Sequence, residues 1–136
     1  METNINTKYQ HGDYALYKGE LCQIVNNCGK LLVKVCDNIG EVSMEDVMPI
    51  RITPQLLTAM GLEIVPFYNL HNIRLSDDTI IEYRKMFREL NVSSSNGINV
   101  HYKNCVYLHQ MQQVLRLCGK QDFIKINDVK NNLYIW

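Results

Sequence analysis

The sequence predicts an α+β protein, and three observations carry that prediction. Four short segments of β-type residues follow one another between residues 13 and 50 and are separated by turn residues. Residues 98–102 alternate apolar and polar side chains as a strand does. Residues 104–119 then form an amphipathic helix with both ends marked. We therefore expect two β-rich regions, the second packed on a C-terminal helix.

The first β-rich region is expected to be a small barrel spanning residues 9–52, after a polar, disordered terminus at 1–8. Its strands are 13–17, 21–25, 30–36 and 41–50, and glycine- and asparagine-containing turns link them. Leu31, Val33 and Val35 share one face of the third strand, so this face should line a core. Residues 45–50 predict one helical turn and a short final strand, with Pro49 at its end. The opening Gly-Asp-Tyr-Ala-Leu-Tyr, the hairpin spacing and this closing turn resemble an SH3-like β-barrel, a scaffold that hosts many functions.

A short connecting helix is predicted within residues 53–62. Thr53 is suited to cap its first N–H groups, Pro54 fits the first helical position, and Gly61 fits the left-handed residue that ends a helix. The helix separates the barrel from an α+β subdomain at residues 63–136.

The middle of that subdomain has two interpretations from periodicity. Ile80, Tyr83, Phe87 and Leu90 fit a helical stripe, whereas residues 79–83 alternate like a strand. Both alternatives, helix and hairpin, remain open for residues 76–92 on this pattern alone.

The helix at 104–119 is expected to bury one face and expose the other. Asn104 is the predicted N-cap and Gly119 the predicted terminator. The apolar face consists of Leu108, Met111, Leu115 and Cys118, and the face predicted to lie in water consists of His109, Gln110, Gln112, Gln113 and Arg116. Residues 122–126 then predict a strand, and the apolar end at 133–136 should dock on the chain or contact a partner.

A resemblance spans most of the chain. Its motifs are Thr53-Pro-x-Leu-Leu followed by Met60-Gly61, then Asn96-Gly-Ile-x-Val100, and then Tyr107-Leu-His-Gln-Met-Gln-x-x-Leu115-Arg-Leu-Cys-Gly119. These residues resemble a group of small uncharacterised proteins encoded by bacteriophages and prophages of gut anaerobes. The resemblance implies a β-hairpin at residues 79–92 and an intracellular, mobile-element origin. It implies no activity.

The charge balance excludes a large net charge, and the short apolar runs exclude a membrane-spanning helix. The 14 basic and 14 acidic side chains cancel, although residues 64–136 carry nine bases against six acids. The apolar runs are far shorter than the roughly 20 residues of a membrane helix. Five cysteines form no close pair, and we see no signal peptide, so we expect a protein of the host-cell cytoplasm.

Catalytic and metal chemistry has weak support. Cys105 and His109 are four residues apart, a spacing that suits two metal ligands or a nucleophile and its base, but the sequence positions no further ligand. The carboxylates of Asp77, Asp78 and Glu82 lack a cation-binding motif around them. We expect Cys22, Cys28 and Cys36 to act as small buried apolar residues. We therefore predict no catalytic residue, no metal and no cofactor.

Binding residues are predicted at three places. Tyr83, Arg84 and Arg88 combine an aromatic ring with bases, a combination that suits nucleobases and phosphates. The barrel tyrosines Tyr14 and Tyr17 suit a protein contact. The polar helix face adds the last two candidates, His109 and Gln112.

These observations predict a non-enzymatic, phage- or prophage-encoded binding protein that acts through protein contacts, with host machinery as its target and no membrane partner. The alternative is a nucleic-acid or nucleotide-binding module that uses the barrel and the basic second half. A cysteine- and histidine-dependent enzyme is the third hypothesis, and a homo-oligomer is compatible with each of them.

Overall fold

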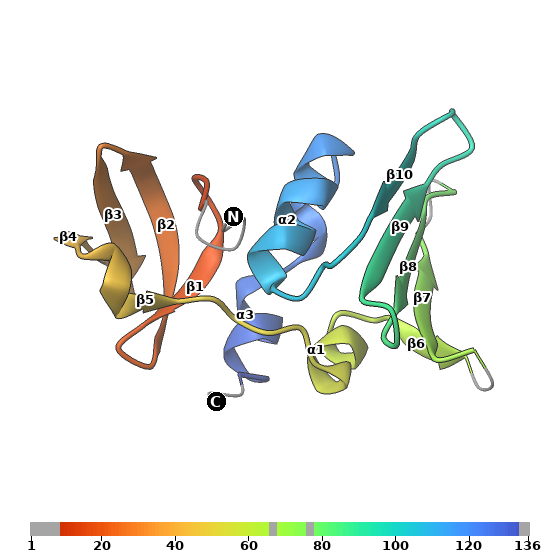
Figure 1. The fold of residues 1–136 in the computed structure, drawn as a ribbon, viewed down its shortest axis with the longest axis horizontal. Coiled ribbons are helices and arrows are strands. Elements are labelled where there is room, and N and C mark those ends of the chain that lie inside the picture. Colours follow the sequence, from red (N-terminus) through yellow and green to blue (C-terminus); the bar gives the residue numbers. More distant parts are fainter. Residues whose placement is uncertain (1–8, 66–67, 76–77, 134–136) are drawn as a thin grey trace.

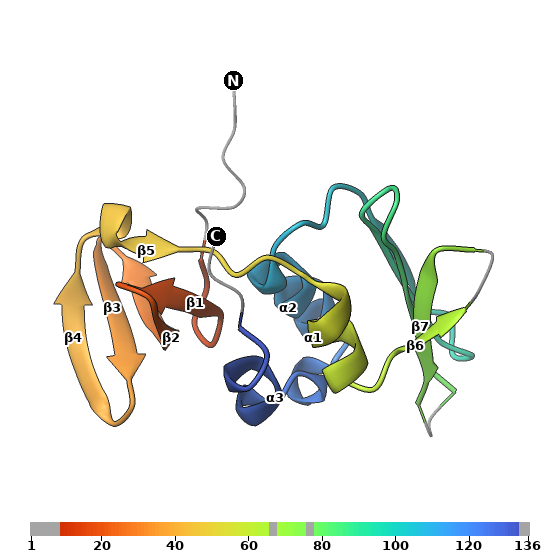
Figure 2. The same ribbon diagram turned by 90° about the horizontal axis from the view of Figure 1, so that it is seen from below.

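Two antiparallel five-stranded sheets enclose a layer of three α-helices (Figure 1). The computed structural model describes residues 9–65, 68–75 and 78–133, so the predicted disordered terminus at 1–8 and the last three residues lie outside the described part. Figure 2 shows the same order from below, with the helices between the sheets. The predicted α+β class is confirmed.

The first sheet is built from hairpins, as predicted. It contains β1 (Tyr14–Tyr17), β2 (Glu20–Cys28), β3 (Lys30–Val35), β4 (Asn38–Val42) and β5 (Val47–Met48), in the order β4-β3-β2-β1-β5. A 3-10 turn at Met44–Asp46 precedes β5, which confirms the predicted helical turn and final strand. Within residues 9–65 no pairing joins β4 to β5, so closure into an SH3-like barrel stays a prediction.

The second sheet is a meander in which each strand pairs with the next along the chain. It contains β6 (Glu63–Val65), β7 (Leu70–Arg74), β8 (Ile80–Arg84), β9 (Glu89–Ser93) and β10 (Asn99–Tyr102). Residues 79–92 therefore form a hairpin, and the helical alternative is excluded. The reason is a period of two: Ile81 and Tyr83 are buried opposite Val92 and Leu90, while Phe87 lies exposed in the turn.

The connecting helix α1 (Pro54–Ala59) has the predicted ends. Thr53 Oγ1 accepts from the Leu56 N–H at 3.1 Å, and Pro54 is the first helical residue. Gly61 has φ +97°, and the Leu62 N–H donates back to the Leu57 carbonyl at 3.0 Å.

The long helix α2 (Leu108–Leu117) begins later than predicted. Asn104 is not its N-cap, because it lies four residues before the helix with φ 60°. The start is fixed instead by Gln110, whose Oε1 accepts from the N–H groups of Val106 and Tyr107 at 2.9 and 3.0 Å. Gly119 follows the helix with φ +74°, as a terminator should.

The predicted strand at residues 122–126 is wrong. The chain makes a 3-10 turn at Gln121–Phe123 and then helix α3 (Ile126–Lys130). Ile124 and Val129 are buried five residues apart, and Asp128 lies in the first turn of α3, where a carboxylate is favourable. Ile126, at the start of α3, is exposed.

One large core joins the helices to both sheets. Its members come from β1, α1, β8, β9, α2 and α3, and they include the predicted Leu108, Met111 and Leu115. In β1, Leu16 faces this core, whereas Ala15 faces a smaller core within the first sheet, which also contains Leu31 and Val33 as predicted. Because β1 contributes to both cores, the first sheet is packed against the rest of the molecule.

Candidate functional site

Most of the polar face of α2 is buried, so the prediction that it lies in water is wrong for His109, Gln110 and Gln112. His109, Gln110 and Gln112 expose only 0%, 5% and 7% of their surface. The cause is the first sheet, whose leading segment and strand β1 lie against this side of the helix (Figure 1). Two predicted binding residues, His109 and Gln112, are thereby placed inside the molecule.

Gln112 joins the helix to the backbone that enters β1. Its Oε1 accepts from the Tyr14 N–H at 2.8 Å, and its Nε2 donates to the Gly12 carbonyl at 3.2 Å. Such bonds satisfy the buried amide and fix the position of the strand on the helix. Tyr14 is itself buried, so it belongs to the core and not to a contact surface.

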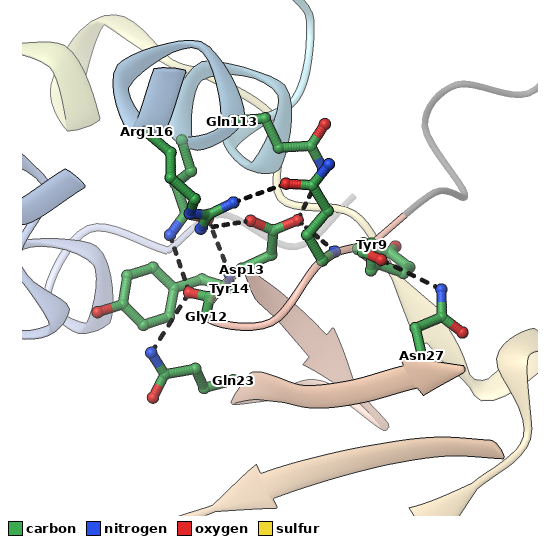
Figure 3. A network of polar contacts seen from close by, with 10 residues as sticks. Tyr9, Gly12, Asp13, Tyr14, Gln23, Asn27, Gln113 and Arg116 are labelled. Carbon is green, nitrogen blue, oxygen red and sulfur yellow. Dashed lines mark hydrogen bonds and ion pairs between the residues drawn. The ribbon is translucent and has the colours of Figure 1, made fainter. Parts of the chain in front are cut away.

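Asp13 is at the centre of the polar contacts that connect α2 to the segment entering β1 (Figure 3). Its fully buried carboxylate accepts from Arg116 Nη2 at 3.0 Å and from Gln113 Nε2 at 2.8 Å. It also accepts from the Gln10 N–H at 2.8 Å, and Arg116 Nη1 donates to Gln10 Oε1 at 2.9 Å. A buried charge is tolerated when it is paired and hydrogen-bonded, as here. We call Gln10, Gly12, Asp13, Gln112, Gln113 and Arg116 the Asp13 joint.

His109 packs between aromatic rings at the same interface. The centroid of its ring lies 4.8 Å from that of Tyr9 and 6.0 Å from that of Tyr107. Tyr9 belongs to the core of the first sheet, so His109 carries the packing from α2 into that sheet. This position indicates a structural role for the ring.

Cys105 is a buried free thiol. It is completely buried before the start of α2, and the Tyr83 hydroxyl donates to its carbonyl at 2.5 Å. Burial raises the pKa of the Cys105 thiol to about 12, so the thiolate that a nucleophile requires is scarce at neutral pH. No group of three or more His, Cys, Asp or Glu side chains suited to a metal ion occurs within residues 9–65, 68–75 and 78–133; Asp77 lies outside this part.

The remaining cysteines differ from one another. Cys22 is buried as predicted, but the prediction is wrong for Cys28 and Cys36, which are exposed at the ends of hairpins. Cys28 pairs with Lys30 across the turn, and Cys36 is in a turn with φ 55°, so neither side chain reaches a core.

The predicted residues Tyr83, Arg84 and Arg88 do not form one aromatic and basic patch. The pleat of β8 buries Tyr83 and exposes Arg84, and Arg88 is exposed at the end of the β8–β9 turn. Tyr17 is half-buried, with Lys18 Nζ 5.3 Å from its ring centroid. Of the predicted binding residues, the two arginines are the most accessible.

Exposed apolar side chains lie at the same end of the second sheet as these arginines. Met86 and Phe87 in the β8–β9 turn are 66% and 61% exposed, and Tyr68 in the β6–β7 turn is 67% exposed. The two turns lie at the same end of the sheet, because Leu70 pairs with Arg84 and the Lys85 N–H donates to the Asn69 carbonyl at 3.1 Å. We call this set the hairpin-end surface: Tyr68, Arg84, Lys85, Met86, Phe87 and Arg88. The sequence analysis missed Met86 and Tyr68, although two apolar residues at turn positions were a usable signal.

Comparisons with family models, curated proteins and solved structures find no match to this chain. In the part of the chain that the structure describes, no helix combines the length and the apolar character needed to cross a membrane.

Proposed function

We propose that the protein is a non-enzymatic binding protein that contacts a protein partner through the hairpin-end surface. The supporting observation is its composition: Tyr68, Met86 and Phe87 are largely exposed beside Arg84 and Arg88. Aromatic residues, methionine and arginine are the types enriched in protein interfaces, and arginines and aromatic side chains supply much of the binding energy.

The charge of this surface favours an acidic partner. Residues 84–88 contain three cations and no acid, and the next residue, Glu89, lies 3.6 Å from His101. Complementary charge on the partner would speed its association and fix its orientation. The resemblance to phage- and prophage-encoded proteins supports a host protein in this role, in the cytoplasm of the host.

Capture with matched variants tests the proposal. We expect a partner from host lysate to bind the wild-type chain and the variant Ile39→Ser, and to be lost with Phe87→Ser. Ile39 is a suitable control because it is 59% exposed on β4 in the other sheet. Removing an interface anchor typically costs about 2 kcal/mol or more, a loss of about 30-fold in affinity for the purified partner. Equal binding by all three proteins would refute the proposal.

Nucleic-acid binding is the second candidate, because the same cations lie beside the exposed ring of Phe87. Anisotropy of labelled single-stranded and duplex DNA and RNA should then fall as salt rises, since phosphate contacts release counterions. The double variant Arg84→Gln, Arg88→Gly should flatten that salt dependence. Binding that salt leaves unchanged would exclude this candidate.

A further inference from the structure

A small cavity next to the hairpin-end surface is lined by basic and not by acidic side chains. Its volume is about 150 Å³, and it lies between the start of α1, the chain leading into it and the β8–β9 turn. The lining residues are Arg51, Ile52, Thr53, Pro54, Leu57, Tyr83, Lys85, Arg88 and Val106. Three of these are cations and none is an acid.

No carboxylate in the described part of the chain forms an ion pair with these cations. Within residues 9–65, 68–75 and 78–133, the ion pairs are Arg116 with Asp13 and His101 with Glu89, and neither involves Arg51, Lys85 or Arg88. Three like charges around one cavity repel one another, and water screens that repulsion in part, because Arg51 and Arg88 are exposed. An anion bound in the cavity would attract all three cations and so offset their mutual repulsion.

Backbone hydrogen bonds anchor the two segments that carry Arg51 and Arg88. The Ile52 N–H donates to the Val106 carbonyl at 2.9 Å, which anchors the segment carrying Arg51, and the Arg51 guanidinium lies 6.0 Å from the Tyr107 ring. The Arg88 carbonyl accepts from the Cys105 N–H at 2.8 Å. These bonds fix the main chain on which the exposed side chains of Arg51 and Arg88 stand.

The cavity lining also contains a neutral hydrogen-bond donor, the hydroxyl of Thr53. The Thr53 hydroxyl uses an oxygen lone pair to accept from the Leu56 N–H, which leaves its hydrogen to donate. The Tyr83 hydroxyl already donates to the Cys105 carbonyl, so its ring serves as a wall of the cavity.

From this arrangement we infer that the cavity binds a phosphate group, with Arg51, Lys85 and Arg88 as its charged ligands and Thr53 as a hydroxyl donor. Guanidinium groups match the oxygens of phosphate in pairs, and a dianion suits three cations better than a carboxylate does. The volume lies below the roughly 300 Å³ of pockets for drug-sized molecules, so the cavity accepts the phosphate and leaves any attached group outside. This inference shares Lys85 and Arg88 with the hairpin-end surface, but its test is separate, because a small anion can be titrated without the partner protein.

Titration of the whole chain with inorganic phosphate tests the inference, at constant ionic strength and pH 7.5, followed by ¹H–¹⁵N NMR. We expect saturable shifts of amides within residues 51–57 and 83–88, and at least tenfold weaker binding of acetate. Absence of saturation, or saturable shifts confined to other residues, would overturn the inference.

Three variants sharpen the test. Arg88→Gly removes the guanidinium and suits the backbone, since Arg88 has φ 53°, and Arg51→Gln removes a second ligand. Each should weaken phosphate binding about tenfold or more, the usual scale for a lost charged hydrogen bond. Arg74→Gln is the matched control, because Arg74 is exposed at the opposite end of β7 and does not line the cavity. Equal weakening by Arg74→Gln would show a general charge effect and overturn the inference.

Adenosine monophosphate and phosphoserine distinguish the source of the phosphate. Equal affinity for both and for inorganic phosphate would show that the cavity recognises the phosphate alone. Tighter binding of the nucleotide would support the inference and identify a nucleotide as the source. Failure of all three ligands would refute the phosphate site and leave the protein contact, tested through Phe87, unaffected.

Discussion

Gly12 occupies a position that other residues cannot adopt without strain. Its φ is +94°, and a Cβ there would lie 3.3 Å from Arg116 Nη2 in the Asp13 joint. We expect Gly12→Ala to lower the free energy of unfolding by more than the roughly 1–2 kcal/mol that a left-handed alanine costs. Gly29→Ala is the control, because Gly29 has φ +88° and open space around it. Urea unfolding of both variants measures the difference, and equal losses would show that the close approach to Arg116 is unimportant.

His109 and His101 form a second matched pair. His109 is fully buried against Tyr9, whereas His101 is exposed on β10. Truncation of His109 to alanine should cost about 2–3 kcal/mol, because it opens a cavity between α2 and the first sheet. His101→Ala should change stability by less than about 0.5 kcal/mol, as is usual for a surface site. Thermal unfolding followed by circular dichroism compares the two, and a neutral His109→Ala would contradict the packing described here.

We expect the cysteines to react with iodoacetamide at different rates, according to their burial. At pH 8 we expect fast modification of the exposed Cys28 and Cys36. Cys22 and Cys105 should react only after unfolding, because burial raises the pKa of these thiols to about 11 and about 12. Unfolded thiols ionise near pH 8.5, so stability should fall as the pH rises from there towards 12. Mass spectrometry locates the label, and rapid labelling of Cys105 in the folded chain would revive the enzyme hypothesis.

At the scale of elements, α2 carries the core of the second half. Leu115 is fully buried in the large core, while Leu117, two residues further on, is 82% exposed. We expect Leu115→Asp to unfold the chain, because the lost packing of about 2–5 kcal/mol adds to the cost of burying a charge. Leu117→Asp on the same helix should leave the fold intact. Far-ultraviolet circular dichroism separates the outcomes, and two folded variants would show that α2 is dispensable for the core.

Local signals explain which elements could be predicted. The ends of α1 and the turns of the first sheet depend on residues within a few positions, so the sequence alone indicates them. The start of α2 depends on Gln110 bonding back to Tyr107, a rarer pattern than the asparagine cap that was predicted. Residues 122–126 carry a strand-like alternation, but both sheets are formed without them and the segment packs onto the helices.

At the scale of the whole molecule, the Asp13 joint between α2 and the first sheet could not be predicted from the sequence. Asp13 and Arg116 are 103 residues apart, and glutamines on a helix ordinarily indicate a face in water. The same is true of the cavity, where Arg51 joins Lys85 and Arg88 only because the chain entering α1 lies beside the β8–β9 turn. Local patterns therefore predicted both β-rich regions. They did not predict the Asp13 joint or the cavity, where these regions meet other elements.

Because of the Asp13 joint, we expect residues 1–52 and residues 53–136 to fold as one unit. Without residues 53–136, Tyr14 and Leu16 would lose the helices that bury them, and the Asp13 carboxylate would lose Arg116 and Gln113. The loss of burial and the unpaired charge together exceed the stability of about 5 kcal/mol expected of so small a region. We therefore expect the fragments 1–52 and 53–136 to give poorly dispersed NMR spectra separately, and the intact chain to unfold in one transition. Mixing the fragments should restore dispersed signals, whereas a dispersed spectrum from 1–52 alone, unchanged by the second fragment, would show that the first sheet is an independent domain.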